Sequence, residues 1–168
     1  DKKQIAQELD VSFVSSGGNV IDDEYIEYHN ENYVREPKYK AEMEKSMWIW
    51  KEPQEGHKYI MGVDVSRGDG ADSSTIVILD FDGLEQVAEF QYKLPPDLLA
   101  EIVYKYGNLY QAYTVVDITG GMGVSTVMKL LEMEYKYLHY DDPKSRSLSE
   151  KYAKTLYKQG DKVPGYNV

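Results

Sequence analysis

Residues 58–92 read KYIMGVDVSRGDGADSSTIVILDFDGLEQVAEFQY, and this stretch decides the fold. Short apolar runs bounded by Gly, Asp and Ser are typical of buried strands, so the pattern predicts strands over 58–66, 73–81 and 84–92. The Asp-Gly pair at 82–83 predicts a hairpin turn between the second and third strands. This part of the chain is therefore expected to form the first half of a β-sheet.

The residues that follow alternate between helical and strand patterns. Pro95 and Pro96 open a helix with apolar residues at helical spacing, and Gly107 is expected to end it. Further elements are predicted as a strand at 112–118, a helix at 122–134, a strand at 135–140 and a last helix that starts at the capping box of Ser147 and Glu150. The order β-β-β-α-β-α-β-α predicts an α/β fold in which helices flank a mixed β-sheet, the ribonuclease H-like plan. Because no further helix follows, we expect this fold to be truncated at its C-terminus.

Two aspartates stand at the predicted ends of buried strands, Asp64 in YIMGVDVS and Asp117 in YTVVDITGG. An ionised carboxylate in such a place is costly unless it is paired or binds a metal, and converging carboxylates suit Mg²⁺ or Mn²⁺. Taken alone, Asp64 is equally consistent with capping of the following turn. Asp69 is better explained by turn chemistry, whereas Asp72 is as consistent with a metal as with a cap.

The glycine loop after Asp117, TGGMG, allows two interpretations. It is consistent with a phosphate cradle at a helix N-terminus, although it lacks the P-loop pattern. The better interpretation is backbone clearance, because glycine lets a bulky polyanion come close to a metal.

Composition excludes several classes of protein. The 168 residues include no cysteine, so disulfides and thiolate zinc sites are excluded, and the three histidines lack the spacing of a zinc site. No GxSxG nucleophile elbow is present, and no histidine pairs with Ser66 by sequence. No apolar run is long enough to span a membrane, and no signal peptide opens the sequence, so we expect a soluble, intracellular protein.

The net charge of −10 argues against a nucleic-acid partner, but the charge is unevenly distributed. Residues 1–57 carry 13 acidic and 7 basic side chains, whereas residues 144–162 carry six basic and two acidic ones. Lys151, Lys154 and Lys158 share one face of the predicted last helix. Such a face is more often a solvated surface, and the alternative is contact with the phosphate backbone of DNA.

Three segments together resemble the large terminase subunit of tailed bacteriophages, in particular the T4-like group. They are IAQELDVSFVSSGGNVID at 5–22, YIMGVDVSRGDGADSSTIVILD at 59–80 and VVDITGGMGVSTVMKLLE at 115–132. The resemblance implies that residues 1–20 are the tail of an ATPase domain, that 21–57 are a hinge or linker, and that 58–168 form an incomplete ribonuclease H-like nuclease domain.

The resemblance also implies an activity, namely metal-dependent endonucleolytic cleavage of concatemeric viral DNA with two Mg²⁺ or Mn²⁺ ions. Asp64 matches the acid on the first strand, Asp117 matches the acid on the fourth, and Asp72 matches an accessory acid in the loop after the first strand. The implied partners are double-stranded DNA, the viral portal and the small terminase subunit, in the host cytoplasm at the procapsid portal. The family's third acid would lie beyond residue 168, so this chain alone is expected to cleave poorly or not at all.

Three alternatives remain open at the level of sequence. A resolvase or transposase core would share the acids but not the segment at 5–22. A non-catalytic module that binds a metal or docks on a portal would bind without turnover. An actin-like phosphotransferase ranks last, because that fold needs two such domains and far more chain.

Overall fold

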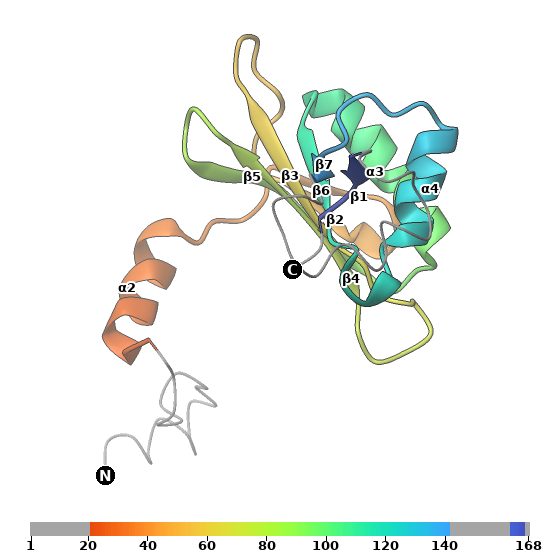
Figure 1. Cartoon of the computed structure of the whole chain (residues 1–168). Coiled ribbons are helices and arrows are strands. Elements are labelled where there is room, and N and C mark those ends of the chain that lie inside the picture. Colours follow the sequence, from red (N-terminus) through yellow and green to blue (C-terminus); the bar gives the residue numbers. More distant parts are fainter. Residues whose placement is uncertain (1–20, 142–161, 167–168) are drawn as a thin grey trace. The chain divides into compact units, whose positions relative to one another are not determined.

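The computed structural model describes residues 21–141 and 162–166 (Figure 1). The chain divides into two compact units, Asp1–Glu36 and Pro37–Val168. In the first unit the structure describes helix α2, Asp23–Tyr33, which buries none of its residues. The second unit contains a β-sheet and the helices that pack on it.

The sheet has six strands in the spatial order β1-β2-β5-β4-β3-β6. All neighbouring strands run antiparallel except β3 and β6, which run parallel. The strands are β1 (Tyr39–Ala41), β2 (Met47–Ile49), β3 (Tyr59–Asp64), β4 (Ser74–Asp80), β5 (Glu85–Tyr92) and β6 (Tyr113–Val116).

This arrangement confirms the predicted mixed sheet of a ribonuclease H-like α/β fold. Strands β3, β4 and β5 form an antiparallel meander, and the crossover through helix α3 returns the chain to β6 beside β3. Strands β1 and β2 extend the sheet beyond β5 and were not predicted, because three residues are too few to show a period. A short 3₁₀ helix, η2 (Met43–Lys45), joins them.

Helices α3 (Pro96–Tyr110) and α4 (Val124–Glu132) lie together on one face of the sheet (Figure 1). Alternate strand residues point to these helices and are buried, as period-two side-chain direction requires. The Thr126 hydroxyl donates a 2.8 Å hydrogen bond to the Pro96 carbonyl and so ties the two helices together. The buried face of the sheet includes Met61, Val63, Ile76, Ile78, Ala88, Phe90 and Val116.

The sequence predicts that the helix ends at Gly107, and this prediction is wrong. Helix α3 continues to Tyr110, and Gln111 closes it in the left-handed conformation, with φ 49°. Gly107 instead makes room for a neighbour, because a Cβ there would lie 1.9 Å from the hydroxyl oxygen of Tyr135. The glycine thus marks a close approach inside the helix rather than its end.

The strand predicted at 135–140 is shorter and later than expected. Strand β7 covers Tyr140–Asp141 and pairs antiparallel with β8, Val163–Pro164, while Leu138 makes an isolated parallel bridge to Thr114. Tyr135 is buried, and its hydroxyl lies 2.7 Å from the Thr114 hydroxyl. Burial raises the pKa of Tyr135 to about 12. Tertiary packing therefore overrides the strand pattern here. The predicted last helix lies outside the described residues.

Candidate metal and phosphate site

The parallel pairing of β3 and β6 brings two of the predicted site residues to one edge of the sheet. Val63 pairs with Val116, and the Asp117 N–H donates a 2.9 Å hydrogen bond to the Val63 carbonyl. Asp64 and Asp117 are therefore the next residues along two neighbouring strands. Because the carboxyl ends of parallel strands meet at the same edge, both aspartates lie where a ligand of this fold class is expected.

A pocket of about 590 Å³ opens beside the end of β3. The loop from β3 to β4 forms most of its wall, and Met122 contributes from the loop that follows β6. Asp64 and Asp72 therefore border one cavity, whereas Asp117 lies next to Asp64 but not on the pocket wall. The lining residues are Asp64, Val65, Ser66, Arg67, Asp69, Gly70, Asp72, Ser73 and Met122.

Two anchors hold the backbone of this loop. The Ser66 N–H donates a 3.0 Å hydrogen bond to the fully buried hydroxyl of Ser74, and the two serine hydroxyls lie 3.2 Å apart. Gly68 has φ +80° and packs so closely on the segment just before α3 that a Cβ would lie 2.4 Å from the Leu94 carbonyl oxygen. Only glycine meets both conditions without displacing the loop.

Asp117 is positioned by its own glycine loop. Its Oδ1 accepts a 2.7 Å hydrogen bond from the Thr119 N–H at the start of the 3₁₀ helix η3, Thr119–Gly121. Gly123 lies against the same residue, because a Cβ there would come within 2.0 Å of the Asp117 carbonyl oxygen. The sequence predicted that the glycines of this loop leave room for a polyanion. At Gly123, the atoms that occupy this room are the backbone atoms of Asp117.

The carboxylates of the pocket differ in their partners. Within residues 21–141 and 162–166, no hydrogen bond or ion pair engages the carboxylate of Asp64 or Asp72. Asp69 instead accepts a 2.8 Å hydrogen bond from the Arg67 guanidinium. Two unpaired, exposed carboxylates beside serine hydroxyls form a set of hard oxygen donors, which fits Mg²⁺ or Mn²⁺.

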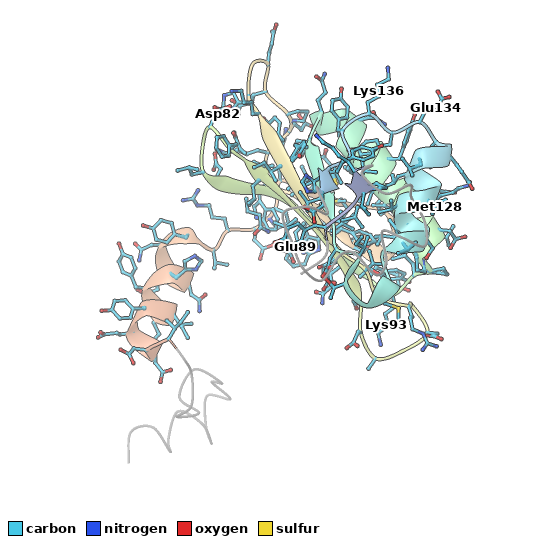
Figure 2. All side chains as sticks on the ribbon, in the orientation of Figure 1. Asp82, Glu89, Lys93, Met128, Glu134 and Lys136 are labelled. Carbon is cyan, nitrogen blue, oxygen red and sulfur yellow. The ribbon has the colours of Figure 1, made fainter. Side chains whose placement is uncertain are left out.

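A second group of metal-binding side chains lies at the opposite end of the sheet and was missed at the level of sequence. His57, Asp80 and Asp82 place one ligand atom each within 4.8 Å of one another; in the part of the chain that the structure describes, no other set of three does so. Asp82 lies in the turn between β4 and β5, far from Lys93 at the end of β5 (Figure 2). The pairing of His57 with Asp80 joins residues 23 positions apart, which no local pattern reveals.

This second group is already satisfied by hydrogen bonds. The Asp80 Oδ1 accepts from the Asp82 and Gly83 N–H groups, and its Oδ2 lies 2.7 Å from the His57 Nδ1. The Asp82 Oδ2 accepts from the Lys58 N–H at 2.8 Å. Burial alone would raise the pKa of Asp80, but the hydrogen bonds from His57, Gly83 and Asp82 outweigh it and hold the pKa below its usual value. We interpret the group as a clasp that fastens the β4–β5 turn to the start of β3.

A pH dependence of stability follows from this clasp. A folded-state pKa below the ordinary 3.8 means that ionised Asp80 stabilises the fold above that value, and that the contribution is lost as the pH falls through the lowered pKa. We expect Asp80→Asn to be less stable than the wild type at neutral pH and the difference to shrink in acid. Urea unfolding of both proteins at neutral and acid pH measures this. An unchanged difference would contradict the assignment.

Lys151, Lys154 and Lys158 lie outside the described residues. Among the residues that are described, no helix combines the length and apolar character that crossing a membrane requires.

The fold is similar to that of solved phage nuclease domains. No protein-family model matches the sequence, and no curated protein matches it.

The magnesium-bound large terminase nuclease of the thermophilic phage G20c is 17% identical, with a TM-score of 0.48 over 59% of this chain and 52% of that one. The cobalt-bound form gives 19% identity and a TM-score of 0.47 over the same shares. The large terminase nuclease domain of Thermus phage P74-26 is 15% identical, with a TM-score of 0.43 over 78% of this chain and 80% of that one. The chain spans about half the length of the G20c structures, and it is similar in fold to large terminase nuclease domains of thermophilic phages.

Proposed function

We propose that this chain is the nuclease domain of a phage DNA-packaging terminase, which cleaves concatemeric viral DNA by metal-dependent hydrolysis of a phosphodiester bond. The observation that carries the proposal is the edge formed by β3 and β6. There, Asp64 presents an unpaired carboxylate to a pocket of about 590 Å³, and Asp117 follows the neighbouring strand. Asp64 and Asp72 are exposed at this pocket, and among the described residues no hydrogen bond or ion pair engages either carboxylate, so a metal can reach both without displacing a partner.

Each acid has a role in this proposal. Asp64 and Asp117 would hold Mg²⁺ or Mn²⁺, two ions in the complete site, and Asp72 would reach the same metal from the loop between β3 and β4. The ions would supply an activated water and neutralise charge on the phosphate. The loop anchors at Ser74 and Gly68 would keep Asp64 and Asp72 at a fixed separation.

The wider assignments rest on the resemblance in sequence. Residues 1–20 would close a preceding ATPase domain, and 21–57 would connect it to the nuclease domain at 58–168, with β1 and β2 paired to the nuclease sheet. Lys151, Lys154 and Lys158 would contact phosphates of double-stranded DNA. The portal and the small terminase subunit would be partners, and the protein would act in the host cytoplasm at the procapsid portal.

A non-catalytic metal-binding module is the second candidate. The observation that favours it is the group of His57, Asp80 and Asp82, whose ligand atoms are closer together than those of the pocket acids. If that group held the metal, the ion would lie at the end of the sheet opposite to the pocket. The two candidates therefore predict different residues for metal binding.

Mn²⁺ binding to the 168-residue chain separates these candidates. Electron paramagnetic resonance measures the free Mn²⁺ that remains in the presence of the wild type, Asp117→Asn or Asp82→Asn. Each variant lacks one carboxylate. We expect Asp117→Asn to weaken binding by more than about tenfold and Asp82→Asn to leave it unchanged. The reverse result would move the metal to the clasp and reject the proposed site.

Cleavage is tested by nicking of supercoiled plasmid with Mg²⁺ or Mn²⁺ and with a chelator. The 168-residue chain would be compared with a longer polypeptide that contains it and continues beyond Val168. Metal-dependent nicking by either protein supports a nuclease. If metal binds at Asp117 but neither the 168-residue chain nor the longer polypeptide nicks the plasmid, the non-catalytic module is supported instead.

A further inference from the structure

The pocket wall contains one basic side chain, Arg67, among three aspartates. The Arg67 Nη2 donates a 2.8 Å hydrogen bond to the Asp69 Oδ2, and the two side chains are 66% and 64% exposed. An exposed ion pair of this kind contributes little to stability, because water screens both charges. The pair can therefore open at little cost, and folding alone gives no strong reason for it.

The backbone around this pair is fixed while the side chains are free. Ser66, which precedes Arg67, is bonded to the buried Ser74, and Gly68 lies between the two charged residues, packed against the Leu94 carbonyl. The loop thus holds the backbone of Arg67 in a fixed position at the rim of the pocket. The guanidinium can exchange partners by side-chain rotation, with no movement of the loop.

The charge around Arg67 determines what it can bind. Asp64, Asp69 and Asp72 make the pocket negative, so an anion that enters needs a positive partner at the rim. A guanidinium can bind a phosphate through two parallel charge-assisted hydrogen bonds, whereas the exposed pair with Asp69 has a single hydrogen bond, from Arg67 Nη2 to Asp69 Oδ2. A phosphate diester is thus able to displace Asp69.

We propose that Arg67 binds a backbone phosphate of the nucleic acid that enters this pocket, and that Asp69 occupies the guanidinium until the phosphate displaces it. The inference deepens the proposed nuclease function and rests on it. It assigns Arg67 to substrate binding and makes Asp69 an internal competitor of the substrate. Asp64 and Asp72 remain available to metal, because Arg67 pairs with neither of them.

The test is a double-mutant cycle on DNA affinity. Fluorescence anisotropy of a labelled DNA duplex would be measured at low salt with EDTA, which excludes both hydrolysis and metal binding. The proteins are the wild type, Arg67→Gln, Asp69→Asn and the double variant, all as the 168-residue chain. Both substitutions are at exposed positions whose side chains have each other as partners, so the fold is expected to remain intact.

The proposal predicts a specific pattern in the four affinities. Arg67→Gln should weaken binding by about tenfold and lower the slope of affinity against salt by about one ion. Asp69→Asn should tighten binding by about threefold, because it releases Arg67. In the Arg67→Gln background the Asp69→Asn gain should disappear, whereas a mere reduction of negative charge would tighten binding equally in both backgrounds.

Each other outcome overturns the proposal. An equal gain from Asp69→Asn in both backgrounds, an unchanged affinity of Arg67→Gln, or no measurable binding by Asp69→Asn would each reject the role of Arg67. Plasmid nicking with Mn²⁺ keeps this failure separate from that of the nuclease. Nicking with an unchanged Arg67→Gln affinity rejects only the phosphate contact. The predicted affinities, without nicking by either the 168-residue chain or the longer polypeptide, reject only the nuclease.

Discussion

Asp64→Asn is expected to lower the rate of metal-dependent DNA cleavage by about a thousandfold or more while leaving the fold intact. The amide keeps the shape of the side chain but loses the charge that binds a hard cation. Loss of a residue that only supports a metal ligand already costs 10–100-fold, and loss of one electrostatic contact to a transition state costs about 10²–10³-fold, so loss of a ligand itself should cost more.

The structure gives a reason to expect an intact fold in this variant. The Asp64 side chain is exposed, and no hydrogen bond or ion pair engages its carboxylate among the described residues. Substitutions at such positions usually change stability by less than about 0.5 kcal/mol.

The measurement is the initial rate of plasmid nicking by the shortest polypeptide that contains this chain and cleaves DNA. Asp82→Asn is the matched control, because it removes a carboxylate from the clasp at the other end of the sheet. Urea unfolding of both variants confirms that each is folded. Cleavage by Asp64→Asn within a few fold of the wild type would remove Asp64 from the site.

Gly123→Ala is expected to destabilise the protein by about 1–3 kcal/mol or more and to disturb Asp117. A Cβ at this position would lie 2.0 Å from the Asp117 carbonyl oxygen and 2.9 Å from its carbonyl carbon. Both are backbone atoms, so the conflict cannot be relieved by a side-chain rotation. Helix α4 and the end of β6 must move apart, and Asp117 must move with them.

Gly62→Ala provides the control for this prediction. Gly62 lies in β3, two residues before Asp64, and a Cβ there would meet no atom within 4 Å. Alanine is the better residue in an element interior by about 0.5–1 kcal/mol, so this variant should be as stable as the wild type or slightly more stable. Thermal and urea unfolding measure both variants, and Mn²⁺ binding reports on Asp117. Equal stability of the two variants would contradict the close approach at Gly123.

The sequence was sufficient for the elements whose side chains repeat over a long enough run. Strands β3, β4 and β5 and helices α3 and α4 were each predicted within a few residues, and the Asp-Gly turn lies between β4 and β5. Strands β1 and β2 were missed because each has three residues and gains its stability from pairing with distant parts of the chain.

The errors at Gly107 and at residues 135–137 have a common cause. Glycine is a frequent helix end and Tyr a frequent strand residue, so the local pattern favoured a helix end and a strand. In the folded protein Tyr135 packs against Gly107, and this one contact overrides both preferences. The secondary-structure preference of a single residue type could not reveal a contact between residues far apart in sequence.

For the candidate site, the sequence predicted positions better than interactions. Strand-end acids were enough to place Asp64 beside Asp117 and to suggest Asp72 in the loop between β3 and β4. Asp69 was explained by turn chemistry, and its pairing with Arg67 was not foreseen. The clasp of His57 and Asp80 was also missed, because it depends on the register of β3 with β4. The metal-binding and catalytic roles remain predictions.

The pairing of β3 with β6 also determines when the candidate site can form during folding. Strands β3, β4 and β5 are joined by short connections, whereas β6 reaches β3 only after the chain has closed a loop of roughly fifty residues through α3. A partly folded molecule that contains the three-stranded meander without β6 would present Asp64 and lack Asp117 beside it. If the proposed site binds metal, tight binding would therefore report the completed tertiary structure, and a chain without the β3–β6 pairing would bind metal weakly.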